Sequence, residues 1–194
     1  MISMKVVSFL ASHGGSSAKA IIDAAKSGAL NVEIGVVITN NRDSSIYEWC
    51  VDNDVRVHHV SGKTHPNEAL KDEVVRGHLL QARTDLVVLS GYMKKIGPAT
   101  LATFNNRILN IHPSLLPKHG GRGLYGDKVH ESVLASGDKV SGATVHLINE
   151  EYDEGPVLVQ EEVPVLEDDS VLSLKQRVQE IESSLYISAI EKMA

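Results

Sequence analysis

An amide and an imidazole lie two residues apart in the segment Ile108-Leu109-Asn110-Ile111-His112-Pro113. The aliphatic residues around them predict a strand over residues 107–111, and alternate residues of a strand project from one face, so Asn110 and His112 would lie side by side. Such a pair can polarise a carbonyl, hold a developing oxyanion and move a proton. The structural alternative is that Asn110 satisfies loop backbone groups while His112 is a buried, hydrogen-bonded histidine.

A carboxylate in a second polar segment, Asn149-Glu150-Glu151-Tyr152-Asp153-Glu154-Gly155-Pro156, is a third candidate. Composition alone favours a solvated turn, where carboxylates are common. Gly155 and Pro156, however, set a specific bend between two predicted strands. That bend could aim Asp153 inward.

A loop rich in glycine and serine, His13-Gly14-Gly15-Ser16-Ser17, connects a predicted strand (residues 4–12) to a predicted helix (residues 18–27). Glycine lets the backbone approach a ligand closely, and the free N–H groups of a helix's first turn attract anions. The loop is neither a dinucleotide fingerprint nor a P-loop. It predicts either a phosphate site or a tight turn in which Ser17 caps the helix.

Apolar segments alternate with amphipathic ones through the first half of the chain. Strands are predicted at residues 32–39, 55–60, 85–89 and 107–111, and helices at residues 44–53 and 66–82. Continuous apolar strands separated by helices favour an α/β fold with a doubly wound, mostly parallel sheet and helices on both faces. After His112 the pattern changes to a loop at 113–122, a helix at 127–136, strands at 142–148 and 157–165, and a helix at 170–193. We predict a single domain over residues 1–194, with an antiparallel element in its C-terminal half.

Composition narrows the class of protein. A net charge of −6 argues against a nucleic-acid partner, which would require a basic face. Cys50, the one cysteine, cannot form an internal disulfide and is more plausibly a packed side chain than a nucleophile. No apolar stretch approaches the roughly 20 residues needed to cross a bilayer, and the start lacks a signal peptide. We expect a cytoplasmic protein without a membrane partner.

Together these segments resemble the folate-dependent formyltransferases, most closely those that act on glycinamide ribonucleotide. The resemblance spans nearly the whole chain in the right order, and its first motif is highly specific. It implies the formyltransferase fold, with a phosphate-binding half at about residues 1–106 and a catalytic and folate-binding half at about 107–194. It also overrides the structural alternatives for Asn110, His112 and Asp153. The residues that carry it are Asn110-Ile111-His112-Pro113-Ser114-Leu115-Leu116-Pro117, Gly142-Ala143-Thr144-Val145-His146 and Asp153-Glu154-Gly155-Pro156-Val157, with the glycine loop and Leu89-Ser90-Gly91-Tyr92-Met93.

By this resemblance, the chain would transfer the formyl group of 10-formyltetrahydrofolate to the amine of glycinamide ribonucleotide in de novo purine (IMP) biosynthesis. The implied catalytic residues are Asn110, His112 and Asp153. The implied substrate contacts are Gly15, Ser16 and Ser17 for the phosphate, with Gln179 and Glu182 for the ribose and glycinamide. The implied folate contacts are Met93, Lys94, Ile96, His146, Glu150 and Tyr152. No metal is implied, and the protein would be a monomer or a homodimer.

Three segments depart from the family pattern. Asn67 stands where an arginine would contact the phosphate, Lys94-Lys95 replaces an arginine after Met93, and residues 119–126 are longer and richer in glycine. We hypothesise that Lys118 or Arg122 supplies the missing positive charge.

The same residues are compatible with other functions. A formyltetrahydrofolate deformylase would share the three polar residues but usually carries an extra N-terminal domain, and a methionyl-tRNA formyltransferase would need a basic C-terminal domain. A sugar-nucleotide N-formyltransferase is a further alternative. A non-catalytic ligand-binding module would have no need of a proton-transfer cluster.

Overall fold

The computed structural model describes residues 4–193, which divide into two compact units, one up to Leu109 and one from Asn110 to Met193. Residues 1–3 and Ala194, which the single-domain prediction includes, lie outside the described residues. Seven strands form one sheet in the order β3-β2-β1-β4-β5-β6-β7. The strand pairs from β3 to β5 are parallel, whereas β6 and β7 are antiparallel. The predicted fold class is therefore confirmed.

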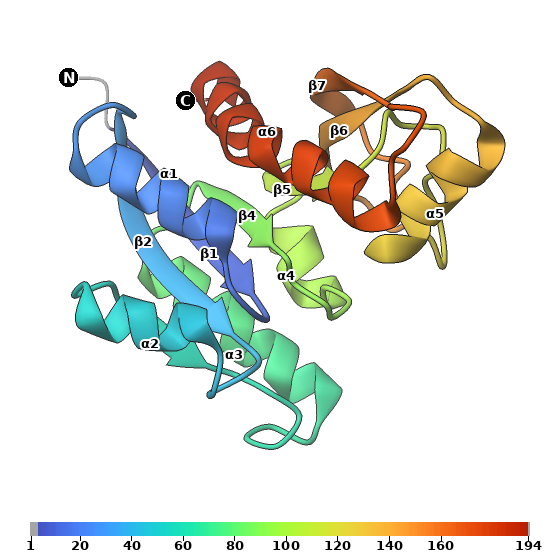
Figure 1. Cartoon of the computed structure of the whole chain (residues 1–194). Coiled ribbons are helices and arrows are strands. Elements are labelled where there is room, and N and C mark those ends of the chain that lie inside the picture. Colours follow the sequence, from blue (N-terminus) through green and yellow to red (C-terminus); the bar gives the residue numbers. More distant parts are fainter. Residues whose placement is uncertain (1–3, 194) are drawn as a thin grey trace. The chain divides into compact units, whose positions relative to one another are not determined.

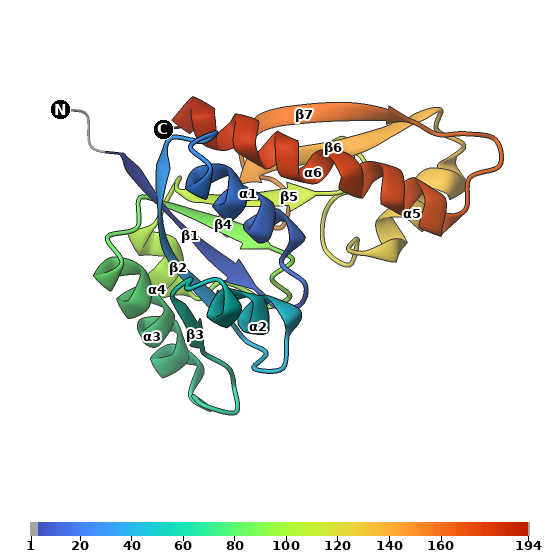
Figure 2. The same ribbon diagram turned by 60° about the vertical axis from the view of Figure 1, so that its left-hand side comes forward.

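The first unit contains a parallel sheet whose central strands, β1 and β4, are almost entirely buried. Helices α1 and α2 lie on one side of these strands and α3 and α4 on the other (Figures 1 and 2). Right-handed crossovers produce this arrangement, because the chain first moves outward to β3 and then returns to β4. The elements are β1 (Lys5–Ala11), α1 (Ser16–Lys26), β2 (Val32–Thr39), α2 (Ser45–Asp52), β3 (Val57–His59), α3 (Glu68–Gln81), β4 (Leu86–Ser90), α4 (Pro98–Thr103) and β5 (Ile108–His112).

Helix α4 is not predicted from the sequence. It has six residues, with Gly97 as its N-cap, and no side chain within the helix caps it. The cap comes instead from Asp72 on α3, whose carboxylate accepts the N–H groups of Ala99 at 2.7 Å and Thr100 at 3.1 Å. A Cβ at Gly97 would lie 2.2 Å from the Asp72 carboxyl carbon, so glycine is required there. Because the cap comes from another helix, the sequence around α4 carries no capping signal.

The second unit is built around its long C-terminal helix. Helix α6 lies along β6 and β7 and also contacts α5, as Figure 2 shows. Its fully buried side chains include Leu174, Val178 and Tyr186. The elements that follow β5 are α5 (Asp127–Ser136), β6 (Val140–Leu147), β7 (Val157–Pro164) and α6 (Val171–Met193).

Candidate active site

Asn110 and His112 lie at the carboxyl end of β5. The start of this strand pairs with β4 through Ile108 and Leu109, which are buried, so the strand is held rigidly before the polar residues begin. Strand alternation then places Asn110 and His112 on one face. The His112 side chain is 4% exposed, and a nearly dry imidazole requires partners for both ring nitrogens.

The ring nitrogens of His112 both face acceptors. Nε2 lies 2.8 Å from the carbonyl oxygen of His119. A carbonyl can only accept, so this nitrogen carries a hydrogen. Nδ1 lies 3.4 Å from Oδ2 of Asp153, which is longer than a normal hydrogen bond and can tighten when substrate binds. The charged imidazolium satisfies both contacts, and the neutral ring satisfies only one.

Asp153 is held between several groups of the second unit. Its Oδ2 accepts the backbone N–H of Gly121 at 2.9 Å, and its Oδ1 lies 3.6 Å from Nε2 of His146. Its side chain is 13% exposed, so it is not the solvated turn carboxylate that composition alone favours. Asp153 has a positive φ of 59°, and a Cβ on the nearby Gly155 would lie 1.7 Å from the Leu147 carbonyl oxygen. The bend thus requires glycine and aims the carboxylate at the histidines.

His146, which the resemblance assigns to the folate pocket, orients Asn110. Its Nδ1 donates to its neighbour's carbonyl, that of Leu147, at 3.1 Å, and its Nε2 lies 3.1 Å from Nδ2 of Asn110. Burial lowers the pKa of His146 below its ordinary value of 6.5, although Leu147 and Asp153 oppose the effect. A neutral His146 therefore accepts one Asn110 N–H. The second N–H of that amide is left for another acceptor.

Sequence reasoning missed the contributions of His119 and Gly121. Both act on the site through backbone atoms, a carbonyl and an amide, which every residue type except proline supplies. The available signal was the glycine-rich character of residues 119–126. His119 itself has a positive φ of 57°.

The glycine loop lies at the N-terminus of α1 in the first unit. Gly15 has a φ of 60° and is the N-cap, with no side-chain cap, so the alternative in which Ser17 caps the helix is wrong. A Cβ at Gly15 would lie 2.7 Å from the Ile46 side chain, which makes glycine obligatory. The N–H of Ala18 donates to Ser90 Oγ at 3.1 Å. Ser16 is exposed and Ser17 is buried at the start of the helix.

The other expected ligand contacts fall in both units. Met93, Lys94 and Ile96 lie in the irregular segment that follows β4, where the Met93 N–H donates to Ser12 Oγ at 2.8 Å. In the second unit, Glu150 and Tyr152 are exposed in the connection between β6 and β7, and Gln179 and Glu182 lie on α6, with Gln179 exposed. Burial raises the pKa of the Glu182 carboxyl to about 7, partly offset by Lys175.

The two candidates for the missing positive charge differ in their surroundings. Asn67 is the N-cap of α3, where its Oδ1 accepts the Leu70 N–H at 2.9 Å. Lys118 forms an ion pair with Asp138 at 2.5 Å. Arg122 is exposed and has no ion-pair partner within residues 4–193. A role of either residue at the phosphate stays a prediction.

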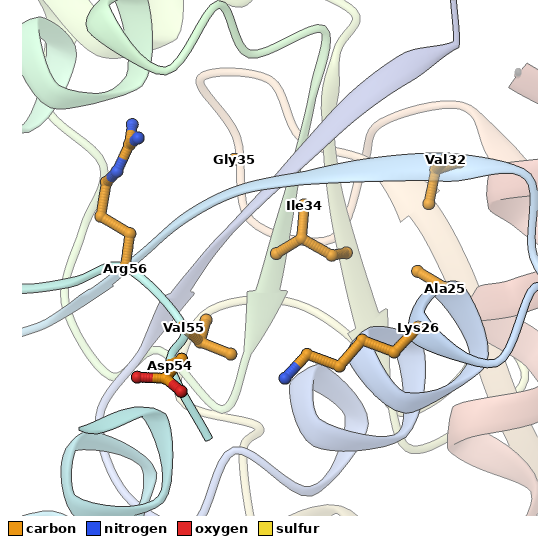
Figure 3. A pocket seen from close by; sticks show the side chains of 8 residues that line it. All are labelled: Ala25, Lys26, Val32, Ile34, Gly35, Asp54, Val55 and Arg56. Atoms are coloured by element: carbon orange, nitrogen blue, oxygen red, sulfur yellow. The ribbon is translucent and has the colours of Figure 1, made fainter. Parts of the chain in front are cut away.

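None of the predicted site residues lines the hollow of about 400 Å³ in the first unit (Figure 3). The Lys26 amine already donates to the Asn53 carbonyl at 2.7 Å. In Figure 3 the Arg56 guanidinium points away from Lys26 and Asp54, so the charges do not converge on a ligand. The hollow is lined by Ala25, Lys26, Val32, Ile34, Gly35, Asp54, Val55 and Arg56.

Residues 4–193 contain neither a membrane-spanning helix nor a metal-binding cluster. No helix there is both long and apolar enough to span a membrane. No group of three or more histidine, cysteine or acidic side chains there is arranged to hold a metal ion.

Residues 4–190 match the formyl transferase family, and the chain belongs to that family. It is 37% identical over 187 residues to a chloroplastic phosphoribosylglycinamide formyltransferase of Arabidopsis thaliana, an alignment that covers 96% of this chain and 64% of the plant protein. The chain thus spans less than two thirds of that relative. It is 34% identical to phosphoribosylglycinamide formyltransferase of Haemophilus influenzae, with coverage of 94% and 84%.

Solved structures agree with the fold. Glycinamide ribonucleotide transformylase 1 of Symbiobacterium toebii superimposes with a TM-score of 0.89 at 35% identity, covering 96% of this chain and 86% of that one. A formyltetrahydrofolate deformylase of Pseudomonas syringae has a TM-score of 0.86 at 24% identity, with coverage of 97% and 61%. The second likeness concerns the fold alone.

Proposed function

We propose that this chain transfers the formyl group of 10-formyltetrahydrofolate to the primary amine of glycinamide ribonucleotide. The observation that carries the proposal is the convergence of Asn110, His112 and Asp153 in a member of the formyl transferase family. Acyl transfer to an amine needs donors for an oxyanion and a group that moves a proton. An amide, an imidazolium and a carboxylate supply these functions.

In the proposed reaction, the substrate amine attacks the formyl carbon and forms a C–N bond. The tetrahedral intermediate then carries a negative oxygen and an ammonium group. The second N–H of Asn110 and an imidazolium at His112 stabilise the oxygen, while the Asp153 carboxylate lies on the Nδ1 side of that ring. Asp153 also helps to move the ammonium proton to folate N10, which leaves as the C–N10 bond breaks. No atom or electron is required from elsewhere.

The remaining residues would bind the two substrates. In the first unit, Gly15, Ser16 and Ser17 bind the phosphate through the start of α1. In the second unit, Gln179 and Glu182 share one face of α6 and contact the ribose and glycinamide. Met93, Lys94, Ile96, His146, Glu150 and Tyr152 contact the folate. A cytoplasmic location and a monomeric or homodimeric state are part of the same proposal.

A turnover assay tests this function against its alternatives. The purified chain is given 10-formyltetrahydrofolate with glycinamide ribonucleotide, with an amino-sugar nucleotide, or with no amine. We expect formyl transfer only with glycinamide ribonucleotide. Turnover without an amine would identify a deformylase, transfer to the amino sugar would identify a sugar-nucleotide enzyme, and binding without turnover would identify a ligand-binding module.

His112→Ala provides the matched control for the assay. The substitution removes the ring without adding bulk, and it should nearly abolish transfer while circular dichroism shows an unchanged fold. Near-normal kcat in this variant would remove His112 from the mechanism.

A further inference from the structure

The turn after Pro117 contacts both members of the pair formed by His112 and Asp153. The carbonyl of His119 accepts from His112 Nε2 at 2.8 Å, and the amide of Gly121 donates to Asp153 Oδ2 at 2.9 Å. Two backbone groups, two positions apart in the chain, therefore orient the imidazole and the carboxylate together. Any movement of this turn would change both contacts at once.

The turn is anchored by the side chain of His119. Nδ1 of His119 lies 2.8 Å from Ser132 Oγ on α5, and Nε2 lies 2.8 Å from Asp138 Oδ2. Because a carboxylate only accepts, Nε2 carries the ring hydrogen. The ring is 9% exposed, and the residue has a positive φ of 57°. A non-glycine residue persists in this backbone region only when its surroundings hold it.

Asp138 is fixed as an anion. It pairs with Lys118 at 2.5 Å as well as with His119. Hydrogen bonds from Lys118 and then His119 lower the pKa of the Asp138 carboxyl to about 2. The acceptor for the His119 ring is therefore charged throughout the neutral range.

We propose that His119 is a positioning residue, whose ring, clamped between Ser132 and Asp138, holds the turn that orients His112 and Asp153. The expected change in kcat rests on the proposed function, whereas the expected change in the orientation of His112 does not. His119 itself does not contact the reacting groups. It acts because its backbone carbonyl must lie where His112 Nε2 donates, and its ring decides where that carbonyl lies.

The test compares three variants with one control. His119→Asn suits the positive φ, since asparagine tolerates this region, but its shorter side chain does not reach Asp138. In His119→Gln the side-chain amide can reach Asp138 where Nε2 of His119 stood, although glutamine suits the positive φ less well than asparagine does. Asp138→Asn removes the charge that holds the ring. The control is Glu131→Gln, which removes one negative charge from an exposed position of α5.

Two readouts are measured for each variant. We expect His119→Asn and Asp138→Asn to lower kcat by about 10- to 100-fold, the effect of a small misplacement of reacting groups, with KM nearly unchanged. The second readout is the Nε2–H proton of His112 in ¹⁵N-histidine NMR, assigned by its loss in His112→Gln. This proton should exchange slowly with solvent in the wild type and in Glu131→Gln, and its resonance should be lost in His119→Asn. In His119→Gln both the resonance and kcat should recover.

Several outcomes would overturn the inference. One is a His119→Asn protein with wild-type kcat and an unchanged His112 resonance. Another is an Asp138→Asn protein with wild-type kcat and an unchanged His112 resonance, which would show that contact with Asp138 is irrelevant. Should His119→Asn not fold, Asp138→Asn decides by the same readouts. If the wild type turns over no glycinamide ribonucleotide, the proposed function fails, yet the NMR comparison still tests the clamp.

Discussion

Glu182→Gln should change how the stability of the protein depends on pH. Burial raises the pKa of this carboxyl from 4.5 to about 7. Between these values the folded protein binds the proton more tightly than the unfolded chain does. The stability that the protonated form provides is therefore lost as pH rises through this window. At roughly 1.4 kcal/mol per pKa unit, the loss from pH 4 to pH 8 is about 3 kcal/mol.

Glutamine mimics the protonated carboxyl and does not titrate. We therefore expect the variant to gain stability relative to the wild type as pH rises, by about 3 kcal/mol between pH 4 and pH 8. Urea unfolding followed at four pH values across this range measures the difference, and other titrating groups cancel in the comparison. Glu180→Gln, at an exposed position of the same helix, is the matched control.

A difference in unfolding free energy that stays constant with pH would refute this reasoning. It would mean that Glu182 titrates near 4.5 in the folded state, so that Lys175 or solvent fully compensates its burial. A pH-dependent difference of the same size in Glu180→Gln would also refute it. Under the proposed function, Glu182→Gln should in addition raise KM for glycinamide ribonucleotide.

Three further predictions follow from the site and its supports. Asn110→Ala should lower kcat by about 10²–10³ with little change in KM, as expected for one lost oxyanion donor; unchanged steady-state kcat would exclude that role. Arg122→Ala should raise KM for glycinamide ribonucleotide more than Lys118→Ala does, because Lys118 is already paired with Asp138; equal KM values in Arg122→Ala and the wild type would exclude Arg122. The Arg177 guanidinium lowers the pKa of Asp169, so Asp169→Asn should lower the urea midpoint at neutral pH, and its difference from the wild type should vanish as pH falls below the ordinary aspartate range. A difference that persists in acid would contradict the ion-pair explanation.

The fold was predictable to the extent that each element carries its own signal. Strand β4 and the C-terminal halves of β1 and β2 are mostly apolar because the sheet buries both of their faces, and that pattern needs no knowledge of neighbours. Helix α1 begins two residues earlier than predicted, because Gly15 adopts a positive φ and serves as the cap. Helix α4 was missed because Asp72, far away in the chain, supplies its cap.

The candidate site likewise contains residues that the sequence predicts and one contact that it does not. The spacing of Asn110 and His112 predicted a shared strand face, since alternation is a local property. Composition favours a solvated turn for Asp153, and the resemblance predicts its place in the site. Glycine at position 155 permits the bend, because a Cβ there would lie 1.7 Å from the Leu147 carbonyl oxygen. The carbonyl of His119 was not predictable. A backbone acceptor becomes part of a site only through the path of the chain, and residue type does not encode that path.

Asp153 lies between two histidines whose ring nitrogens have different partners. His112 has an acceptor opposite each ring nitrogen: the His119 carbonyl accepts from Nε2 at 2.8 Å, and the Asp153 carboxylate lies 3.4 Å from Nδ1. His146 donates from Nδ1 and accepts from Asn110 at Nε2, so its hydrogen bonds require the neutral ring. Burial is the largest cause of the lowered pKa of His146, and it favours the same neutral ring. A neutral His146 thus keeps the Asn110 amide turned so that one N–H is left for a substrate oxygen.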